Sequence, residues 1–176
     1  MTTTELDHIR EHIREVPDFP KPGILFKDIT PLLLNDRAFS ESIDRMLDLV
    51  DGQSYHKVAA PEARGFIFGT TIALRLGVGF VPVRKPGKLP HETTSVTYDL
   101  EYGQDTVAMH TDAVEPGERV LLVDDVLATG GTMQACGKLI ESRGASVGNC
   151  LFFMELAALP GRSALKDYSI HSLLTE

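Results

Sequence analysis

Cysteine is scarce in this chain, which has two cysteines, Cys136 and Cys150, among its 176 residues. Neither lies in a C-x-x-C or Cys/His pattern, so the sequence does not indicate a zinc site. Disulfide frameworks are typical of secreted proteins, and the charged, amphipathic residues 1–16 lack the apolar region of a secretory signal. Because both cysteines have apolar or small neighbours, we expect them to be free and buried.

Long apolar runs and an excess of positive charge are also absent. Every apolar run is much shorter than the ~20 residues that span a membrane. The 17 lysines and arginines are outnumbered by 25 aspartates and glutamates, which gives a net charge of −8, whereas nucleic-acid-binding proteins usually present a basic face. The sequence therefore predicts a soluble, cytoplasmic protein with neither a membrane nor a nucleic-acid partner.

Hydrophobic residues make up 43% of the chain, enough to bury one sizeable core in a single domain. A first helix is indicated by the spacing of Leu6, Ile9, Ile13 and Val16. Prolines then end this helix, and residues 17–31 are predicted to form an ordered loop. A second amphipathic helix follows over about 39–50 and ends at Asp51–Gly52.

Strands and helices alternate from residue 57 onward. A β-hairpin is predicted by Thr93–Tyr98 and Thr106–His110. This order indicates an α/β fold with a mostly parallel central sheet flanked by helices, and such sheets bind ligands at the carboxyl ends of their strands. The other predicted strands are 57–61, 79–83, 120–124, 147–156 and 169–174, and the predicted helices are 65–76 and about 132–142.

The segment Val120–Thr132, VLLVDDVLATGGT, combines an apolar strand, two acidic residues and a small-residue loop. The carboxylates of Asp124 and Asp125 can each accept hydrogen bonds from the vicinal hydroxyls of a sugar. The loop leads into a helix, so backbone N–H groups can converge on an anion. A bare ATGGT would be an ordinary strand–helix turn, but the whole string favours a phosphorylated ribose. The phosphate-binding residues would be Ala128, Thr129, Gly130, Gly131 and Thr132.

This segment closely resembles the phosphoribosyl-pyrophosphate (PRPP) motif of the type I phosphoribosyltransferases. Five further strings resemble the adenine phosphoribosyltransferases of that family: FPKPGILFKDITP at 19–31, EARGFIFG at 62–69, RKPGKLP at 84–90, YDLEYG at 98–103 and MELAAL at 154–159. The resemblance implies a type I phosphoribosyltransferase fold with a β-hairpin lid. It also implies transfer of the phosphoribosyl group from PRPP to adenine, which gives AMP and pyrophosphate in purine salvage.

Arg84, Lys85 and Lys88 lie around a Pro-Gly turn. An isolated turn of this kind would be a solvated basic loop, but beside the PRPP motif it predicts a clamp for pyrophosphate. The resemblance adds Ala63 and Arg64 as a second pyrophosphate-binding turn.

Adenine is flat and should stack on an aromatic ring. A phenylalanine is most often a core residue, but the resemblance implies that Phe26 stacks on the base. Leu25 and Lys27 would then contribute backbone groups to the edge of the base, and Leu156 would cover its other face. Lys27 departs from an arginine common in the family, which matters if the side chain contacts the base.

Glu101 lies at the turn of the predicted hairpin, where a solvent-exposed carboxylate is common. The resemblance makes it the general acid/base for the purine, with Tyr102 on the same loop. The segment at about 84–110 would be a flexible lid that excludes water.

The resemblance implies Mg²⁺ held by PRPP oxygens and waters, with no direct protein ligand. His8 and His12 have a metal-binding spacing, but no third ligand is in view, which favours surface histidines. A homodimer is also implied. Within the single domain, 1–176, residues 1–35 would form the N-terminal helix and base-binding loop, and 36–176 the core.

Other functions fit parts of the pattern. The same fold serves transferases for hypoxanthine, guanine, xanthine or orotate, although the segments around Phe26 and Leu156 favour adenine. A PRPP-sensing transcription regulator would need a DNA-binding element, and the acidic chain shows no helix-turn-helix pattern. A noncatalytic nucleotide-binding subunit would not need the intact basic loop and Glu101.

Overall fold

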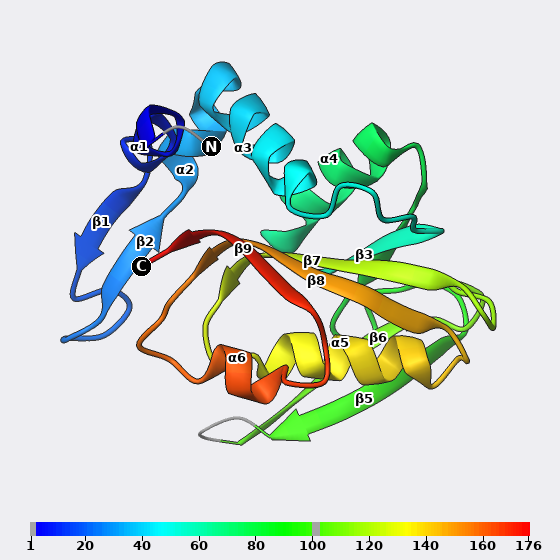
Figure 1. Cartoon of the computed structure of the whole chain (residues 1–176). Coiled ribbons are helices and arrows are strands. Elements are labelled where there is room, and N and C mark those ends of the chain that lie inside the picture. The colour runs from blue at the N-terminus through cyan, green and yellow to red at the C-terminus, as the bar shows by residue number, and fades with distance from the viewer. Residues whose placement is uncertain (1–2, 100–102) are drawn as a thin grey trace. The chain divides into compact units, whose positions relative to one another are not determined.

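A five-stranded parallel sheet forms the centre of the computed structural model, which describes residues 3–99 and 103–176 (Figure 1). Its strand order is β4-β3-β7-β8-β9, so the segment with the acidic pair lies on the middle strand. The parallel sheet and all five predicted strands are confirmed. The strands are β3 (Lys57–Pro61), β4 (Gly79–Val83), β7 (Arg119–Leu127), β8 (Ser146–Glu155) and β9 (Ile170–Thr175).

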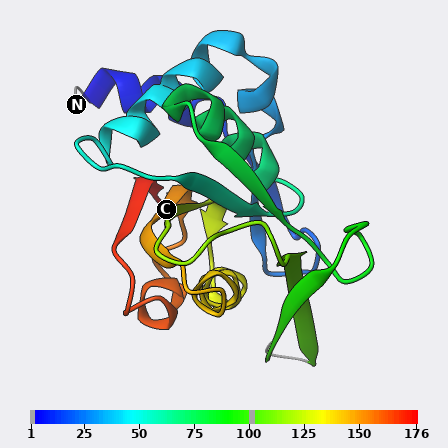
Figure 2. The same ribbon diagram turned by 90° about the vertical axis from the view of Figure 1, so that its right-hand side faces the viewer.

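Helices cover both faces of this sheet. Helix α4 (Gly65–Leu76) lies on one face and α5 (Gly131–Glu141) on the other, as Figures 1 and 2 show. On the α4 side Phe68 stacks on Phe153 with their ring centroids 5.3 Å apart. Burial on both faces explains why the central strands are continuously apolar rather than alternating. The short helix α6 (Gly161–Ala164) follows β8 and was not predicted.

A cluster of buried hydrophobic residues lies on the α5 side of the sheet, and both cysteines belong to it. Cys136 and Cys150 are free and buried, as predicted. Burial raises the pKa of the Cys150 thiol to about 12 and also raises the pKa of Cys136. Both thiols therefore stay protonated, and they act as small apolar core groups.

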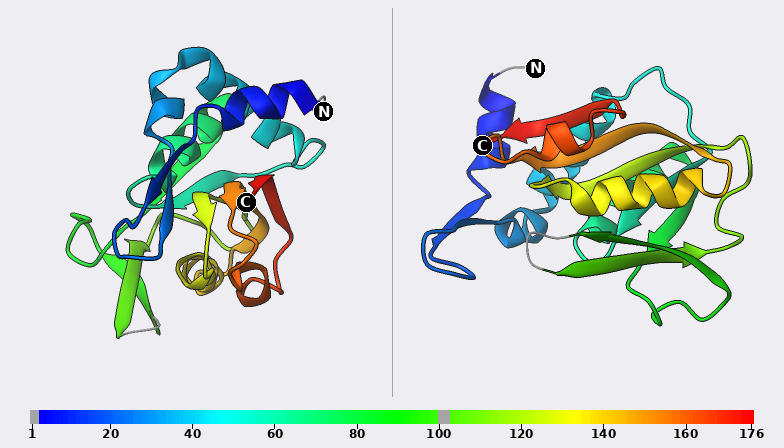
Figure 3. Two further views of the ribbon diagram at one scale, coloured as in Figure 1. Left: turned by 90° about the vertical axis from the view of Figure 1, so that its left-hand side faces the viewer. Right: turned by 90° about the horizontal axis from the view of Figure 1, so that it is seen from below.

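The predicted hairpin consists of β5 (Thr93–Asp99) and β6 (Gln104–His110), which pair antiparallel. Figure 3 shows the hairpin beside α5, which runs along the sheet. Val96 and Tyr98 pack against the core on this side. A backbone bridge between Arg84 and Ala108 ties the hairpin to the chain just after β4.

The chain divides into two compact units, one up to Arg45 and the other from Met46. The division falls within α3 (Asp36–Asp48), which corresponds to the second predicted helix. This helix ends earlier than predicted because tighter hydrogen bonds, from Leu49 N to Met46 O and from Val50 N to Leu47 O, form its last turn.

The first unit corrects two predictions. Its first helix, α1 (Thr3–Arg10), stops well before Val16, and the chain then forms β1 (Arg14–Pro17). The predicted loop contains a strand, β2 (Leu25–Asp28), which pairs antiparallel with β1, and a short helix, α2 (Thr30–Leu34). Helical spacing through Val16 was misleading because the backbone of residues 14–17 forms a ladder with residues 25–28 instead of a further helical turn.

Among the described residues, no helix is long and apolar enough to cross a membrane.

Candidate active site

The acidic pair lies near the carboxyl end of the central strand. Strand β7 continues to Leu127, three residues beyond the predicted strand, so Asp124 and Asp125 are part of the strand rather than the loop. The longer strand is stabilised by parallel pairing with β8, in which Asp124 lies opposite Phe152 and Leu127 opposite Glu155. The two carboxylates are therefore fixed by the sheet itself.

The environments of the two carboxyl groups differ. Asp124 Oδ1 accepts a hydrogen bond from the backbone N–H of Asp125 at 2.9 Å, and burial, followed by the charge of Asp125, raises the pKa of Asp124 well above its usual range. The Asp125 side chain is 6% exposed, and its Oδ2 lies 2.5 Å from Arg64 Nε. This contact is an ion pair and lacks the angles of a hydrogen bond, so within the described part of the chain Asp125 Oδ2 accepts no hydrogen bond. Asp125 thus has a buried acceptor that a ligand hydroxyl can use.

The small-residue loop leads directly from β7 into α5. The helix begins at Gly131, close to the predicted start, and Gly130 adopts a left-handed φ of 84° just before it. A Cβ on Gly130 would come within 2.8 Å of Gly161 O. A cavity of about 80 Å³ joins this loop to Asp124 and is lined by Asp124, Val126, Leu127, Ala128, Thr129, Gly130, Thr132 and Met133.

The basic residues lie after the neighbouring strands β3 and β4. Glu62, which follows β3, accepts hydrogen bonds from Arg84 Nε at 3.0 Å and Nη2 at 2.8 Å. It also accepts one from the Lys85 backbone N–H at 2.7 Å, which is the main reason that its pKa is lowered, with Arg84 adding to the effect. Arg84 Nη1 donates to Lys88 O at 3.0 Å. Glu62 therefore shapes the whole basic turn, residues 84–88.

The resemblance placed Glu62 in the pyrophosphate-binding turn, as the first residue of the EARG string, but did not predict that it pairs with Arg84 and Lys85. The signal was present, because an acidic residue after a buried strand requires a partner. The adjacent Ala63 and Arg64 form the turn into α4, and Arg64 reaches Asp125. The structure thus brings Arg64 to the ribose end of the predicted site as well as to the pyrophosphate turn.

A second cavity, of about 110 Å³, connects the two predicted phosphate-binding loops. Thr132 lines it from the first turn of α5, and Arg84 and Lys85 line it from the basic turn. The hairpin contributes three residues that sequence reasoning did not single out, Tyr98, Asp105 and Val107. The full lining consists of Pro61, Glu62, Val83, Arg84, Lys85, Tyr98, Asp105, Val107 and Thr132.

This geometry agrees with the known proteins that the chain is similar to. Residues 32–172 match the family model of the phosphoribosyl transferase domain. An adenine phosphoribosyltransferase from Caldanaerobacter subterraneus is 57% identical over 169 residues, which cover 96% of this chain and 98% of that protein. The chain belongs to the adenine phosphoribosyltransferases.

Solved structures of the family agree closely with the fold. Adenine phosphoribosyltransferase from Thermoanaerobacter pseudethanolicus has a TM-score of 0.95 at 55% identity, covering 97% of this chain and 99% of that one. The enzyme from Saccharomyces cerevisiae, solved in complex with adenine and an imino-altritol bisphosphate, has a TM-score of 0.92 at 40% identity, covering 98% and 99%. The predicted type I phosphoribosyltransferase fold is thereby confirmed.

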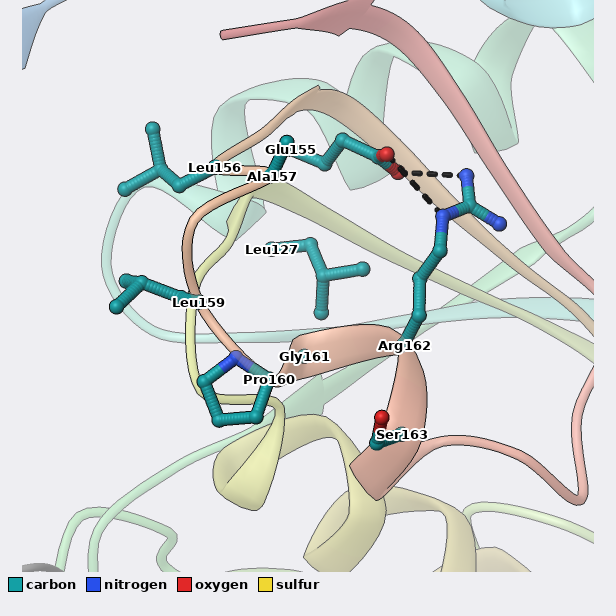
Figure 4. Close-up of a pocket in the computed structure, with 9 residues that line it drawn as sticks. All are labelled: Leu127, Glu155, Leu156, Ala157, Leu159, Pro160, Gly161, Arg162 and Ser163. Carbon is teal, nitrogen blue, oxygen red and sulfur yellow. Dashed lines mark hydrogen bonds and ion pairs between the residues drawn. The ribbon is translucent and has the colours of Figure 1, made fainter.

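In this phosphoribosyltransferase, Leu156 lies beside a pocket of about 310 Å³ at the end of β8 (Figure 4). Glu155 accepts hydrogen bonds from Arg162 at 3.1 and 2.6 Å and from Ser172 Oγ at 2.7 Å, which holds the turn after β8 to α6. Leu127 lines both this pocket and the cavity at the phosphate loop. The half-buried Leu156 thus follows a rigidly held strand end.

The other residues predicted to bind adenine lie on β2 in the first unit. Leu25 is 48% exposed. Phe26 is partly buried and makes an edge-to-face contact with Phe19, with 5.2 Å between the ring centroids. Lys27 Nζ donates to Glu15 Oε1 at 2.7 Å, so its ammonium group is already paired with a residue of its own hairpin.

Glu101 and Tyr102, predicted as the acid/base and a lid residue, lie outside the described residues. Among the described residues, no group of three or more histidines, cysteines or acidic residues is arranged to hold a metal ion. Within the first unit, His8 Nε2 lies 3.8 Å from Glu41 Oε2.

Proposed function

We propose that this chain transfers the phosphoribosyl group of PRPP to adenine, forming AMP and pyrophosphate in purine salvage. The observation that carries the proposal is the cavity that joins the phosphate loop before α5 to the basic turn after β4. PRPP carries phosphates at both ends of one ribose, so two linked anion sites fit it better than one. The family of the chain supports adenine as the acceptor.

The ribose and the 5′-phosphate are held by the segment at the end of β7. Asp124 and Asp125 bind the ribose hydroxyls, and the buried Oδ2 of Asp125 offers an acceptor for one of them. The backbone N–H groups of Ala128–Thr132 and the N-terminus of α5 bind the 5′-phosphate. Side-chain hydroxyls of Thr129 and Thr132 add donors to the same anion.

The pyrophosphate is held by the cations of the basic turn, Arg84, Lys85 and Lys88, and by Ala63 and Arg64. The two carboxylates of the acidic pair have the oxygen donors that Mg²⁺ prefers, but they are adjacent and Arg64 is paired with one of them. A magnesium ion would therefore be held mainly by PRPP oxygens and waters. When bound, it would supply positive charge to the leaving pyrophosphate, while Arg84, Lys85, Lys88 and Arg64 hold that group as the anomeric carbon acquires oxocarbenium character.

Adenine stacks on Phe26, with backbone groups of Leu25 and Lys27 along its edge. The pairing of Lys27 with Glu15 supports a backbone rather than a side-chain role for Lys27. Glu101 manages the purine proton, and Tyr102 belongs to the lid that closes over the site. We also propose, from the family, a cytoplasmic homodimer.

The test is a turnover assay with purified protein, PRPP and Mg²⁺ and one base at a time. AMP should form from adenine, with no nucleotide from hypoxanthine, guanine, xanthine or orotate. The Asp125→Asn variant should keep its fold and bind PRPP at least about tenfold more weakly, because it loses a charged acceptor for the ribose. No turnover with any base would overturn the proposal.

A further inference from the structure

A line of polar contacts runs through the hairpin and joins the two phosphate-binding loops. Lys85 of the basic turn forms an ion pair with Asp105 on β6. Asp105 lies directly opposite Tyr98 on β5, and the Tyr98 hydroxyl is 3.2 Å from Asp105 Oδ2. The same hydroxyl is 2.9 Å from Thr132 Oγ1 on the phosphate loop. Lys85, Asp105, Tyr98 and Thr132 therefore form one connected chain.

These four side chains line one cavity, the one proposed to receive PRPP. The Asp105 side chain is 28% exposed and that of Lys85 is 47% exposed, so an incoming anion can reach both. Hydrogen bonding to Lys85 is the main reason that the pKa of Asp105 is lowered, which keeps this carboxylate ionised. A pyrophosphate group would thus meet a cation that is already paired with an anion.

We propose that Asp105 competes with pyrophosphate for Lys85, and that Tyr98 is a positioning residue that holds Asp105 in place from the phosphate loop. This inference rests on the proposed function. Pyrophosphate carries more negative charge than one carboxylate, so it displaces Asp105 from Lys85. The competition weakens pyrophosphate binding and returns Lys85 to Asp105 when the product leaves.

Tyr98 couples this exchange to the other end of the substrate. Its ring packs beside the start of α5, where a Cβ on Gly131 would lie 3.5 Å from the ring. Its hydroxyl shares a hydrogen bond with Thr132, whose own hydroxyl is proposed to bind the 5′-phosphate. When the Thr132 hydroxyl donates to the phosphate instead, Tyr98 loses its hydrogen bond with Thr132. The Tyr98 hydroxyl is then less firmly positioned, and it restrains Asp105 less.

The test is the dissociation constant of pyrophosphate with Mg²⁺, measured by calorimetry on the full chain. Asp105→Asn keeps the shape of the side chain and should tighten binding about two- to fivefold, as expected for loss of a part-exposed ion pair. The KM for PRPP should fall in the same direction. An unchanged or weaker affinity for pyrophosphate would overturn the proposal.

Two controls separate competition from general repulsion between negative charges. Asp112→Asn removes an equal charge beyond the opposite end of β6 and should leave pyrophosphate binding unchanged. In a Lys85→Met background, Asp105→Asn should have no effect, because the contested cation is gone. An equal gain in that background would show repulsion and would refute the competition.

Tyr98→Phe tests the positioning role. It keeps the ring and removes the hydroxyl, so pyrophosphate should bind more tightly, but by less than with Asp105→Asn. The two substitutions combined should match Asp105→Asn alone, and additive gains would refute a role through Asp105. These binding measurements need no turnover, so a failure of the adenine assay and a failure of this inference are told apart.

Discussion

The phosphate loop before α5, residues 128–132, and the basic turn, residues 84–88, are proposed to hold opposite ends of PRPP, yet they are built differently. The phosphate loop presents backbone groups, and its shape is fixed by the close approach of Gly130 to Gly161. The basic turn presents long cationic side chains, and its shape is fixed by the hydrogen bonds of Glu62 to Arg84 and Lys85.

This difference determines what each loop is sensitive to. A loop formed by close backbone packing should tolerate changes of charge better than changes of volume. A turn held by ion pairs should tolerate added volume better than loss of a charged partner. A substitution that adds volume without changing charge should therefore affect the phosphate loop more than the basic turn. A substitution that removes charge without changing volume should affect the basic turn more.

The largest effect is expected from adding one methyl group at Gly130. Gly130→Ala places a Cβ at positive φ and within 2.8 Å of Gly161 O and 2.9 Å of the Ala164 Cβ. We expect a loss of about 2–4 kcal/mol in the free energy of unfolding, together with loss of most PRPP binding. Denaturant unfolding and the KM for PRPP measure the two effects.

Gly87→Ala is the matched control in the basic turn. Gly87 also has a positive φ, of 76°, but a Cβ there would meet nothing within 4 Å. The expected cost is about 1 kcal/mol, from the backbone conformation alone. Equal costs for the two variants would show that packing around the phosphate loop is not what distinguishes it.

Loss of the carboxylate of Glu62 should have the next largest effect. Glu62→Gln removes the charge that holds Arg84 and the Lys85 backbone, so both cations lose their fixed positions. We expect about 1–2 kcal/mol weaker binding of PRPP, equivalent to a KM raised about five- to thirtyfold, with a smaller change in kcat. Steady-state kinetics at saturating adenine measures both.

Glu118→Gln is the control for removal of a paired glutamate. Glu118 pairs with Lys57 at 2.9 Å, at the amino ends of β7 and β3 and so away from the proposed site. This variant should change stability slightly and leave the KM for PRPP unchanged. If both variants raised the KM equally, the effect of Glu62 would be one of overall folding.

The comparison also explains which parts of the site could be predicted from the sequence. The conformation of residues 128–132 could be predicted because it is set by one local string, from a buried strand through glycine to a helix. The core strands and both covering helices were predicted for the same reason, since each is continuous in sequence.

The contacts around the basic turn could not be predicted in this way. The partners of Lys85 and Arg84 are Asp105 and Glu62, which are separated from them by about twenty residues. The backbone bridge between Arg84 and Ala108 brings Lys85 to β6, and the pairing of β3 with β4 brings Arg84 to Glu62. The cross-strand pair of Tyr98 and Asp105 follows from the register of the hairpin, in which the two residues lie directly opposite each other.

The N-terminal hairpin was missed for a related reason. Ile13 and Val16 fit a helical spacing, and Pro17 and the prolines beyond it suggested a loop. The ladder between β1 and β2 depends on the partner strand, which a local pattern does not reveal.

The smallest effect on the free energy of unfolding is expected for Asp124→Asn in the acidic pair, which removes a charge and leaves the volume of the side chain almost unchanged. Burial, followed by the charge of Asp125, raises the pKa of Asp124 in the folded chain above the ordinary value of 3.8. A carboxyl group of this kind favours folding below its ordinary pKa, and that contribution is lost as the pH rises through the folded-state pKa. Asp124→Asn has no charge to lose and keeps an oxygen that can accept from the Asp125 N–H.

The variant should therefore be more stable than the original chain, by about 1 kcal/mol at pH 8, and the difference should shrink steadily towards pH 4. Binding of PRPP should weaken at the same time, because the ribose loses an anionic acceptor. Thermal unfolding across this pH range, with PRPP binding measured at pH 8, checks both. A stability difference that does not vary with pH would mean that the desolvated charge of Asp124, next to that of Asp125, is not what the fold must accommodate.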